Sequence, residues 1–247
     1  MLGGCAYMNA NTSQLFFWCA GPERVGQSPD DKFYSFETMS GSLSAVDLGE
    51  GLVWRFDKPS TPSDPDDYRC EANGVVSNAA RHNFFDGERY TFSWSSKFSS
   101  VNNVAGRPFV IFQWKSFSGG HQNYPFLLRV NNGRLELIHA TPGDNPTNVE
   151  KKWLFIWSTP VQADVWQRIQ LAVQLSTDRE LGYLLLNFNG YPQAFAIDQD
   201  EAPDPGYIFK CRTLDTTGNT PKWGFYNRGV AEHALIHQVR GLNIRQS

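Results

Sequence analysis

Short β-rich runs separated by turn residues fill the chain from Phe33 onward, and this pattern constrains the fold more than any other feature. No stretch keeps the 3.6-residue period of a helix beyond about two turns. Asn-Gly pairs, which favour the left-handed angles of tight hairpins, stand at Asn132-Gly133 and Asn189-Gly190. The expected strands are Phe33–Glu37, Gly51–Phe56, Tyr68–Ala72, Arg89–Phe98, Phe109–Ser116, Phe126–Asn131, Arg134–His139, Trp153–Trp157, Gln167–Ser176, Gly182–Asn187, Lys222–Asn227 and Ala234–Ile244. So many short strands without helices predict an all-β jelly-roll sandwich of two antiparallel sheets.

The length of 247 residues fits one such sandwich, because all-β domains routinely reach this size. Residues 1–32 are polar, rich in Gly and Asn, and show no period. We expect them to form an irregular N-terminal arm packed on a domain of residues 33–247. No repeat of fixed period is present, which disfavours a propeller. A monomer is expected.

Charge and hydropathy exclude two classes of partner. The net charge is −3 and no block of Lys or Arg occurs, so the electrostatic footprint of a nucleic-acid-binding protein is missing. No apolar run approaches the roughly 20 residues that span a bilayer. Leu15–Ala20 is too short for the core of a signal peptide, so the start fits a mature or trimmed terminus or an intracellular protein. Of these we expect a secreted, extracellular protein.

The four cysteines lack the Cys-x-x-Cys spacing of a structural zinc site. Cys5 and Cys19 bracket a short loop and could form a disulfide in a secreted protein. Cys70 alternates with polar neighbours, which indicates a buried thiol facing the core. A catalytic cysteine is not favoured, because the local sequence offers no His or Asn partner.

Three expected strands carry cationic and hydrogen-bonding side chains on one face, since residues two apart in a strand share a face. The polar set comprises Arg69, Glu71, Gln113, Lys115, Lys222, Gly224, Tyr226 and Arg228. The apolar set on the other face comprises Tyr68, Cys70, Ala72, Val110, Phe112, Trp114, Trp223 and Phe225. An ordinary solvent-facing side is the alternative, but it would favour Thr, Ser, Lys and Glu. A mixture of Arg, Gln, Lys and Tyr beside Gly suits binding of carboxylates and hydroxyls.

The same three segments resemble strands of jelly-roll polysaccharide lyases. Tyr68-Arg69-Cys70-Glu71 resembles their Arg-x-Glu strand, and Lys222-Trp223-Gly224-Phe225-Tyr226 resembles their Lys-x-Gly-x-Tyr strand. Ile111-Phe112-Gln113-Trp114-Lys115 resembles their central Gln-containing strand, and Asn123-Tyr124-Pro125-Phe126 follows it. The likeness is greatest to glucuronan lyases, and then to alginate lyase and heparin lyase relatives. It implies a concave substrate groove and endo-acting cleavage of an acidic uronic-acid polymer, most closely β-1,4-glucuronan, by β-elimination.

The resemblance also implies roles for individual residues. Elimination removes the proton on C5 of the sugar and expels the oxygen on C4, so the neighbouring carboxylate must be neutralised. Gln113 and Arg69, assisted by His82, would do this. Tyr226 would act as both base and acid, because the proton and the leaving oxygen lie on the same side of the ring in β-1,4-glucuronan. A free phenol titrates near pH 10, so nearby cations are needed to favour its anion.

The remaining polar residues are expected to bind substrate. Lys115, Lys222 and Arg228 would grip carboxylates of flanking sugars, and Lys222 and Arg228 would also favour the Tyr226 phenolate. Glu71 would orient Arg69, and Tyr124 would line the site. The alginate lyase pattern has a histidine where Lys115 stands, so the histidine must come from elsewhere. His82 is the first candidate and His121 the second, although His82 also fits a loop surface residue.

Calcium and two other functions stay open. Jelly-roll carbohydrate proteins often carry a structural Ca²⁺, and the region of Asp30-Asp31 and Glu37 is rich in oxygen, but the spacing identifies no metal ligands. A glycoside hydrolase would need two carboxylates roughly 5–9.5 Å apart. Glu71 is one candidate, and the motif strands show no second acidic residue of matching parity. A non-catalytic lectin-like module would need aromatic platforms and no base.

Overall fold

The computed structural model describes residues 16–38, 42–58, 68–103, 106–117, 123–141, 152–196, 206–227 and 234–247. One sheet has nine strands: β1 (Phe17–Cys19), β3 (Ser42–Asp47), β4 (Leu52–Lys58), β8 (Arg89–Phe98), β13 (Gln167–Gln174), β14 (Tyr183–Phe188), β15 (Tyr191–Gln193), β16 (Phe209–Lys210) and β18 (Leu235–Gln246). The second has seven: β2 (Ser35–Glu37), β5 (Tyr68–Asn73), β9 (Phe109–Ser116), β10 (Phe126–Asn131), β11 (Arg134–Thr141), β12 (Lys152–Pro160) and β17 (Asn219–Asn227). A hairpin of β6 (Val76–Ser77) and β7 (Ala80–Arg81) stands apart, and the one helical turn among the described residues is η1 (Pro29–Asp31).

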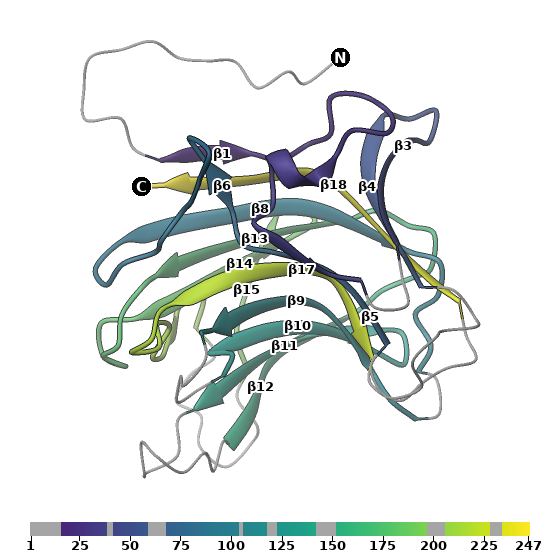
Figure 1. Ribbon diagram of the computed structural model, residues 1–247. Coiled ribbons are helices and arrows are strands. Elements are labelled where there is room, and N and C mark those ends of the chain that lie inside the picture. The colour runs from purple at the N-terminus through teal and green to yellow at the C-terminus, as the bar shows by residue number, and fades with distance from the viewer. Residues whose placement is uncertain are drawn as a thin grey trace.

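The two large sheets form the layers of a sandwich. The seven-stranded sheet has the order β12-β11-β10-β9-β17-β5-β2, and the nine-stranded sheet follows β15-β14-β13-β8-β18-β4-β3, with β1 added beside β18 and β16 beside β14. In Figure 1, β17, β9, β10, β11 and β12 run side by side in one layer, and β8, β13 and β14 lie in the other. Every strand pair is antiparallel, for example β17 with β9 and β8 with β18. The predicted all-β jelly-roll sandwich is confirmed.

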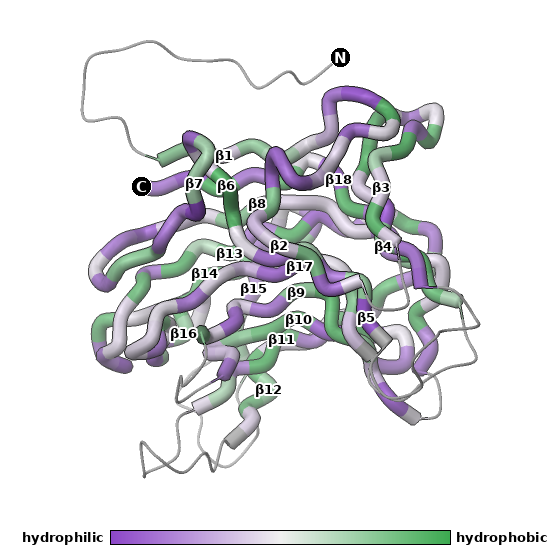
Figure 2. The backbone as a smooth tube through the Cα atoms, in the orientation of Figure 1, coloured by the Kyte–Doolittle hydropathy of each residue, from purple (hydrophilic) through white to green (hydrophobic). Residues whose placement is uncertain are grey.

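Aromatic side chains fill the space between the sheets. Trp54 and Trp94 reach the core from the nine-stranded sheet, and Trp114 and Trp223 reach it from the other; each is at most 2% exposed. Figure 2 shows β10 and β11 hydrophobic along most of their length. Burial of each large apolar side chain contributes roughly 1.5–3 kcal/mol, so this stack supplies a rigid base for the opposite face of the seven-stranded sheet.

The N-terminal arm differs from the expectation of irregular backbone. Phe17–Cys19 forms β1 and pairs with Asn243–Arg245 of β18. Trp18 is buried in the common core, and its indole N–H donates to the Val76 carbonyl oxygen at 3.1 Å. This single Trp anchor outweighs the polar composition around it, so the described part of the arm belongs to the sandwich.

Turns and cysteines follow the sequence more closely. Asn132 and Gly133 both have positive φ in the β10–β11 hairpin, and Asn189 and Gly190 do so between β14 and β15, which confirms both predicted turns.

Cys70 is a buried free thiol as predicted, and burial raises its pKa to about 12. Cys19 is disulfide-bonded; its predicted partner, Cys5, lies outside the described residues. Among the described residues, no helix has the length and apolar character needed to cross a membrane.

Candidate active site

The face of the seven-stranded sheet that points away from the core carries the predicted polar residues, and we call it the polar face. In β5, Cys70 and Ala72 are in the core while Arg69 and Glu71 point the other way. Register places the residues of neighbouring strands beside one another: Lys222 pairs with both Asn73 and Gln113, and Tyr226 pairs with Arg69. The polar face comprises Glu37, Arg69, Glu71, Asn73, Gln113, Lys115, Thr220, Lys222 and Tyr226.

One residue predicted for the core lies on this face instead. A β-bulge in β9 opposite Leu128 and Arg129 adds Ile111 as an extra residue. Phe109 and Ile111 are therefore both in the core, and Val110 turns outward beside Tyr226. The alternation rule fails here because one inserted residue reverses the parity of every position before it.

Two carboxylates and two cations form a cluster at the centre of the polar face. Lys222 Nζ donates to Glu37 Oε1 at 2.8 Å and to Glu71 Oε2 at 3.0 Å. Arg69 Nη1 forms an ion pair with Glu37 Oε2. Gln113 Nε2 donates to Glu71 Oε1 at 2.7 Å, so both oxygens of Glu71 are engaged. The cluster fixes the Gln113 amide and the Arg69 guanidinium in defined orientations.

Glu37 was missed as a site residue, and Lys222 has a different place from the one predicted. The Lys222 side chain is only 3% exposed and lies between the two carboxylates. The structure gives Lys222 two carboxylate partners in the protein, so its contact with a flanking sugar stays a prediction that this burial disfavours. Glu71 does not primarily orient Arg69, from which it lies 3.9 Å away; Glu37 does.

Burial and charge act on the two carboxylates in opposite directions. Burial raises the pKa of Glu71 despite the attraction of Lys222. Burial alone would also raise the pKa of Glu37, but the Lys222 and Arg69 charges outweigh it and lower that pKa. Glu37 is therefore the more readily ionised of the two carboxylates, and it pairs with both Lys222 and Arg69.

Removal of the central cation should destabilise the protein strongly. We expect Lys222→Met to lower the free energy of unfolding by about 3–5 kcal/mol, because two carboxylates lose the charge that compensates their burial. Urea denaturation measures the change. Lys32→Met is the matched control: Lys32 pairs with the exposed Glu23 at 3.2 Å, and loss of such a pair costs at most about 1 kcal/mol. Equal effects of the two substitutions would contradict the cluster's role.

Tyr226 stands beside this cluster, with a cation over its ring. The Arg69 guanidinium carbon lies 4.8 Å from the centre of the Tyr226 ring. A guanidinium at this distance makes a cation–π contact with the ring. Tyr124 is also nearby: burial, and then the charge of Tyr226, raise the pKa of Tyr124 to about 12. Arg69, rather than the predicted Lys222, is thus the described cation that contacts Tyr226.

Aromatic side chains extend the polar face towards β12, and the sequence interpretation missed them. Trp153 and Phe155 alternate along β12 and are 42% and 40% exposed. The Trp153 ring lies 4.9 Å from that of Tyr124, and the Arg129 guanidinium lies 5.0 Å from the Phe155 ring. Lys115 Nζ lies 5.6 Å from the Tyr124 ring and contacts Asn123 Oδ1. The Trp-x-Phe spacing in a strand was the available signal, because it predicts two rings on one face.

A glycine bends β17 between Lys222 and Tyr226. Gly224 has φ +131°, a left-handed conformation that L side chains rarely adopt, and the β9–β17 register shifts between Trp223 and Tyr226. His237 Nδ1–H donates to the Gly224 carbonyl oxygen at 2.6 Å. Burial lowers the pKa of His237 to about 4, so the ring is neutral at pH 7 and its Nε2 accepts from the Ser96 hydroxyl. A buried chain of hydrogen bonds thus fixes the bend that places Tyr226.

His82 does not lie in the site, and this prediction is wrong. Its ring stacks on Phe16 at 3.7 Å and its Nε2–H donates to the Tyr90 hydroxyl at 3.2 Å. Its backbone N–H bonds to Val75, which follows the end of β5 remote from Arg69. Aromatic packing drew the side chain inward, and burial lowers its pKa. His82 is half-buried, and the other described histidines, His139 and His237, are buried.

Other predicted site features cannot be placed on this face. His121 and Arg228 lie outside the described residues. For calcium, the part of the chain that the structure describes has no group of three or more acidic, His or Cys side chains that could hold a metal. Glu37 does not fit a calcium site, since both of its oxygens bind cationic side chains.

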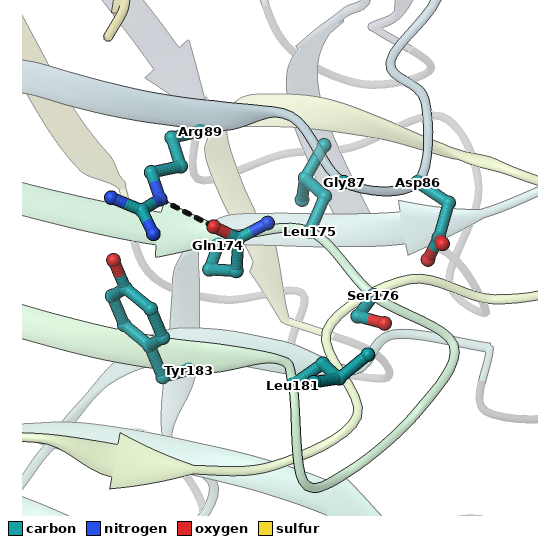
Figure 3. Close-up of a pocket in the computed structure, with 8 residues that line it drawn as sticks. All are labelled: Asp86, Gly87, Arg89, Gln174, Leu175, Ser176, Leu181 and Tyr183. Carbon is teal, nitrogen blue, oxygen red and sulfur yellow. Dashed lines mark hydrogen bonds between the residues drawn. The ribbon is translucent and has the colours of Figure 1, made fainter.

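A separate hollow of about 390 Å³ opens on the outer face of the nine-stranded sheet. Figure 3 shows Arg89, Gln174 and Tyr183 on one side of it and Asp86 and Ser176 on the other. Arg89 Nε donates to the Gln174 side-chain oxygen. The hollow has no counterpart of the buried cation–carboxylate cluster, so we assign the candidate active site to the polar face.

The fold and the polar face define a jelly-roll protein with a surface suited to acidic sugars. A family model described as polysaccharide lyase matches residues 53–239. The chain belongs to this polysaccharide lyase family, which confirms the resemblance found in the sequence. No curated protein matches the sequence.

Solved structures of lyases share the fold at low sequence identity. The endo-β-1,4-glucuronan lyase from the fungus Trichoderma reesei is 13% identical, with a TM-score of 0.66 over 94% of this chain and 95% of that chain. Alginate lyase AlgAT5 of polysaccharide lyase family 7 is 12% identical, with a TM-score of 0.54 over 85% of both chains. The alginate lyase from Corynebacterium sp. is 14% identical, with a TM-score of 0.52 over 83% of this chain and 81% of that chain. At these identities the likeness shows the fold alone.

Proposed function

We propose that this polysaccharide lyase cleaves a uronic-acid polymer, β-1,4-glucuronan before alginate or heparin-like chains, by endo-acting β-elimination. The observation that carries the proposal is the placement of Tyr226 under the Arg69 guanidinium and next to the buried cluster that orients Gln113. A phenol, a guanidinium and an oriented amide are the groups that proton abstraction beside a carboxylate requires.

In this proposal Gln113 and Arg69 stabilise the substrate carboxylate. One amide hydrogen of Gln113 is bound to Glu71, and the amide's second hydrogen is directed to the substrate. Arg69 supplies positive charge while Glu37 holds the guanidinium. Charge that develops on the carboxylate when the C5 proton leaves is then met by donors already in position, which is the condition for electrostatic stabilisation. No described histidine takes part.

In this proposal Tyr226 transfers the proton from C5 of the sugar to the leaving oxygen. The phenolate removes the C5 proton, a C4–C5 double bond forms, the C4–oxygen bond breaks, and the same phenol returns the proton to the leaving oxygen. This use of one residue requires that the proton and leaving oxygen lie on the same side of the ring, as they do in β-1,4-glucuronan. Trp153 and Phe155 would stack on sugars of the same polymer, because exposed rings offer apolar faces to sugar rings.

A glycoside hydrolase is the second candidate, and one observation favours it. Glu37 pairs directly with Glu71 across β2 and β5, so a second acidic residue does stand beside Glu71. The pKa of one carboxylate is raised and that of the other lowered, a division of roles that hydrolases use. Against it, the Glu71 side chain is 3% exposed and both oxygens bind protein groups. A general acid must reach the glycosidic oxygen.

Incubation with uronic-acid polymers distinguishes these functions. We expect ultraviolet absorbance to rise as unsaturated ends form, with glucuronan ahead of alginate and heparin-like chains. The rate should fall as salt rises, because salt screens the exposed cations of the polar face. New reducing ends without the absorbance would instead support the hydrolase, and binding without either signal would support a lectin. Equal action on a neutral glucan would contradict recognition of carboxylates.

The disulfide at Cys19 supports a secreted, extracellular location, because disulfides persist in oxidising surroundings. An extracellular location suits an enzyme that acts on polymers. We therefore keep secretion as part of the proposal.

A further inference from the structure

An arginine outside the cluster is held between two aromatic rings at the far end of the polar face. The guanidinium carbon of Arg81 lies 4.7 Å from the centre of the Tyr34 ring and 4.2 Å from that of Phe117. Arg81 ends β7, Tyr34 precedes β2, and Phe117 follows β9. Contacts with rings from two separate segments restrict the movement of the guanidinium, so less of its freedom is lost when a ligand binds.

Arg81 has no acidic partner among the residues that the structure describes. The other partly buried arginines differ: Arg69 pairs with Glu37, and Arg129 Nε binds Glu136 Oε2 at 2.7 Å. Burial lowers the pKa of Arg81, which reflects the cost of holding this cation away from water. A planar cation held in place without an anion suits a carboxylate that a ligand brings.

Three buried polar atoms at this end of the polar face lack hydrogen-bond partners. Thr220 Oγ1, Asn73 Oδ1 and Arg81 Nε are buried and have no hydrogen-bond partner in the structure. Thr220 is 3% exposed, and its Oγ1 lies 3.3 Å from the point that a Cβ on Gly74 would occupy. Arg81 Nε lies 3.8 Å from the same point, and Asn73 is the adjacent residue. Buried polar groups are normally satisfied, so the place requires a polar occupant, a water or a ligand oxygen.

This place lies along the same face as Tyr226. Thr220 pairs with Lys115 and shares the face of β17 with Lys222 and Tyr226. Thr220 and Tyr226 are six positions apart in β17, which corresponds to roughly 20 Å of strand. A polymer that crosses both places therefore presents different sugar units to them.

We propose that Arg81, with Thr220 and Asn73, forms a remote subsite that binds the carboxylate of a uronic-acid unit several sugars away from the bond that is cut. This inference rests on the proposed function for the identity of the polymer. It adds a binding residue that the sequence resemblance does not contain, and it makes affinity depend on the length and charge of the bound chain.

The test compares Arg81→Gln with the same substitution at a matched arginine, Arg89, on the other sheet. Arg89 also lies over a tyrosine, 5.9 Å from the Tyr183 ring, but on the outer hollow of Figure 3. For Arg81→Gln we expect KM on long glucuronan chains to rise about 10-fold or more, the effect of losing a charge-assisted hydrogen bond. The rise should be smaller on short oligomers, and Arg89→Gln should match the wild type. Arg81→Lys, which keeps the charge but not the plane, should fall between.

Binding and stability measurements separate the outcomes. Thermal unfolding shows whether each variant is folded, and titration calorimetry with long and short glucuronan oligomers reports affinity without turnover. An Arg81→Gln protein with unchanged KM and affinity overturns the subsite, and a buried water then satisfies the unpaired atoms. Equal losses in Arg81→Gln and Arg89→Gln also overturn it. Suppose that the wild type binds glucuronan without cleaving it and that Arg81→Gln weakens this binding. This result overturns the proposed function and supports the subsite.

Discussion

Tyr226→Phe is expected to lower turnover of glucuronan by at least about 10³-fold, the largest effect of any conservative change in the site. The substitution removes only the phenolic oxygen, and general acid and general base roles contribute about 10²–10⁴-fold each. Arg69 keeps its ring contact and its ion pair with Glu37, so fold and polymer binding should change little. Single-turnover kinetics followed by ultraviolet absorbance, with calorimetric binding in parallel, measure the two effects separately.

Tyr124→Phe is the matched control, because it removes the neighbouring phenol from the same face. Burial raises the pKa of Tyr124 to about 12, so little of its phenolate forms near neutral pH. Its loss should cost far less than loss of Tyr226. Gln113→Ala should lie between them, at about 10²–10³-fold, by analogy with loss of one oxyanion donor. Near-normal turnover in Tyr226→Phe with a large loss in Tyr124→Phe would exchange the roles of the two tyrosines.

Most of the fold was predictable because hydrophobic alternation is a local signal. The bounds of Arg89–Phe98, Phe109–Ser116 and Phe126–Asn131 agree with the structure residue for residue. The strands missed were short ones such as β1, or ones formed by pairing rather than composition, such as β3 beside β4. Such strands are stabilised by partners distant in the sequence, which periodicity does not report.

The face on which a site residue lies could be predicted where strand alternation alone determines it. The prediction failed where contacts between distant parts of the sequence determine it. Arg69 and Glu71 could be placed on one face from β5 alone. Glu37 could not be recognised, because it reaches the cluster only through the pairing of β2 with β5. His82 failed for a similar reason: its ring stacks on Phe16, which is far from it in sequence. Lys222 was predicted on the correct face, but its burial depends on both carboxylates at once.

Gly224→Ala should destabilise the protein by more than about 3 kcal/mol, because strain and collision add together. A Cβ at this position would lie well inside contact distance of the Cys70 carbonyl oxygen, 2.8 Å from the Glu71 Cα and 2.9 Å from the Phe56 ring. Two of these neighbours are backbone atoms of β5, which cannot turn aside as a flexible side chain would. Relief requires β5 and β17 to separate beneath the cluster.

Gly190→Ala is the control that isolates the collision from the strain. Gly190 has φ +89°, yet nothing lies within 4 Å of the position of its Cβ. Its substitution should therefore cost only about 1–2 kcal/mol, the range for a non-glycine residue in a left-handed conformation. Urea midpoints at unchanged m-value give both free energies. Equal losses at the two glycines would mean that β17 can move away from β5 freely. A Gly224→Ala protein that stays folded but loses activity would show that the bend exists to aim Tyr226.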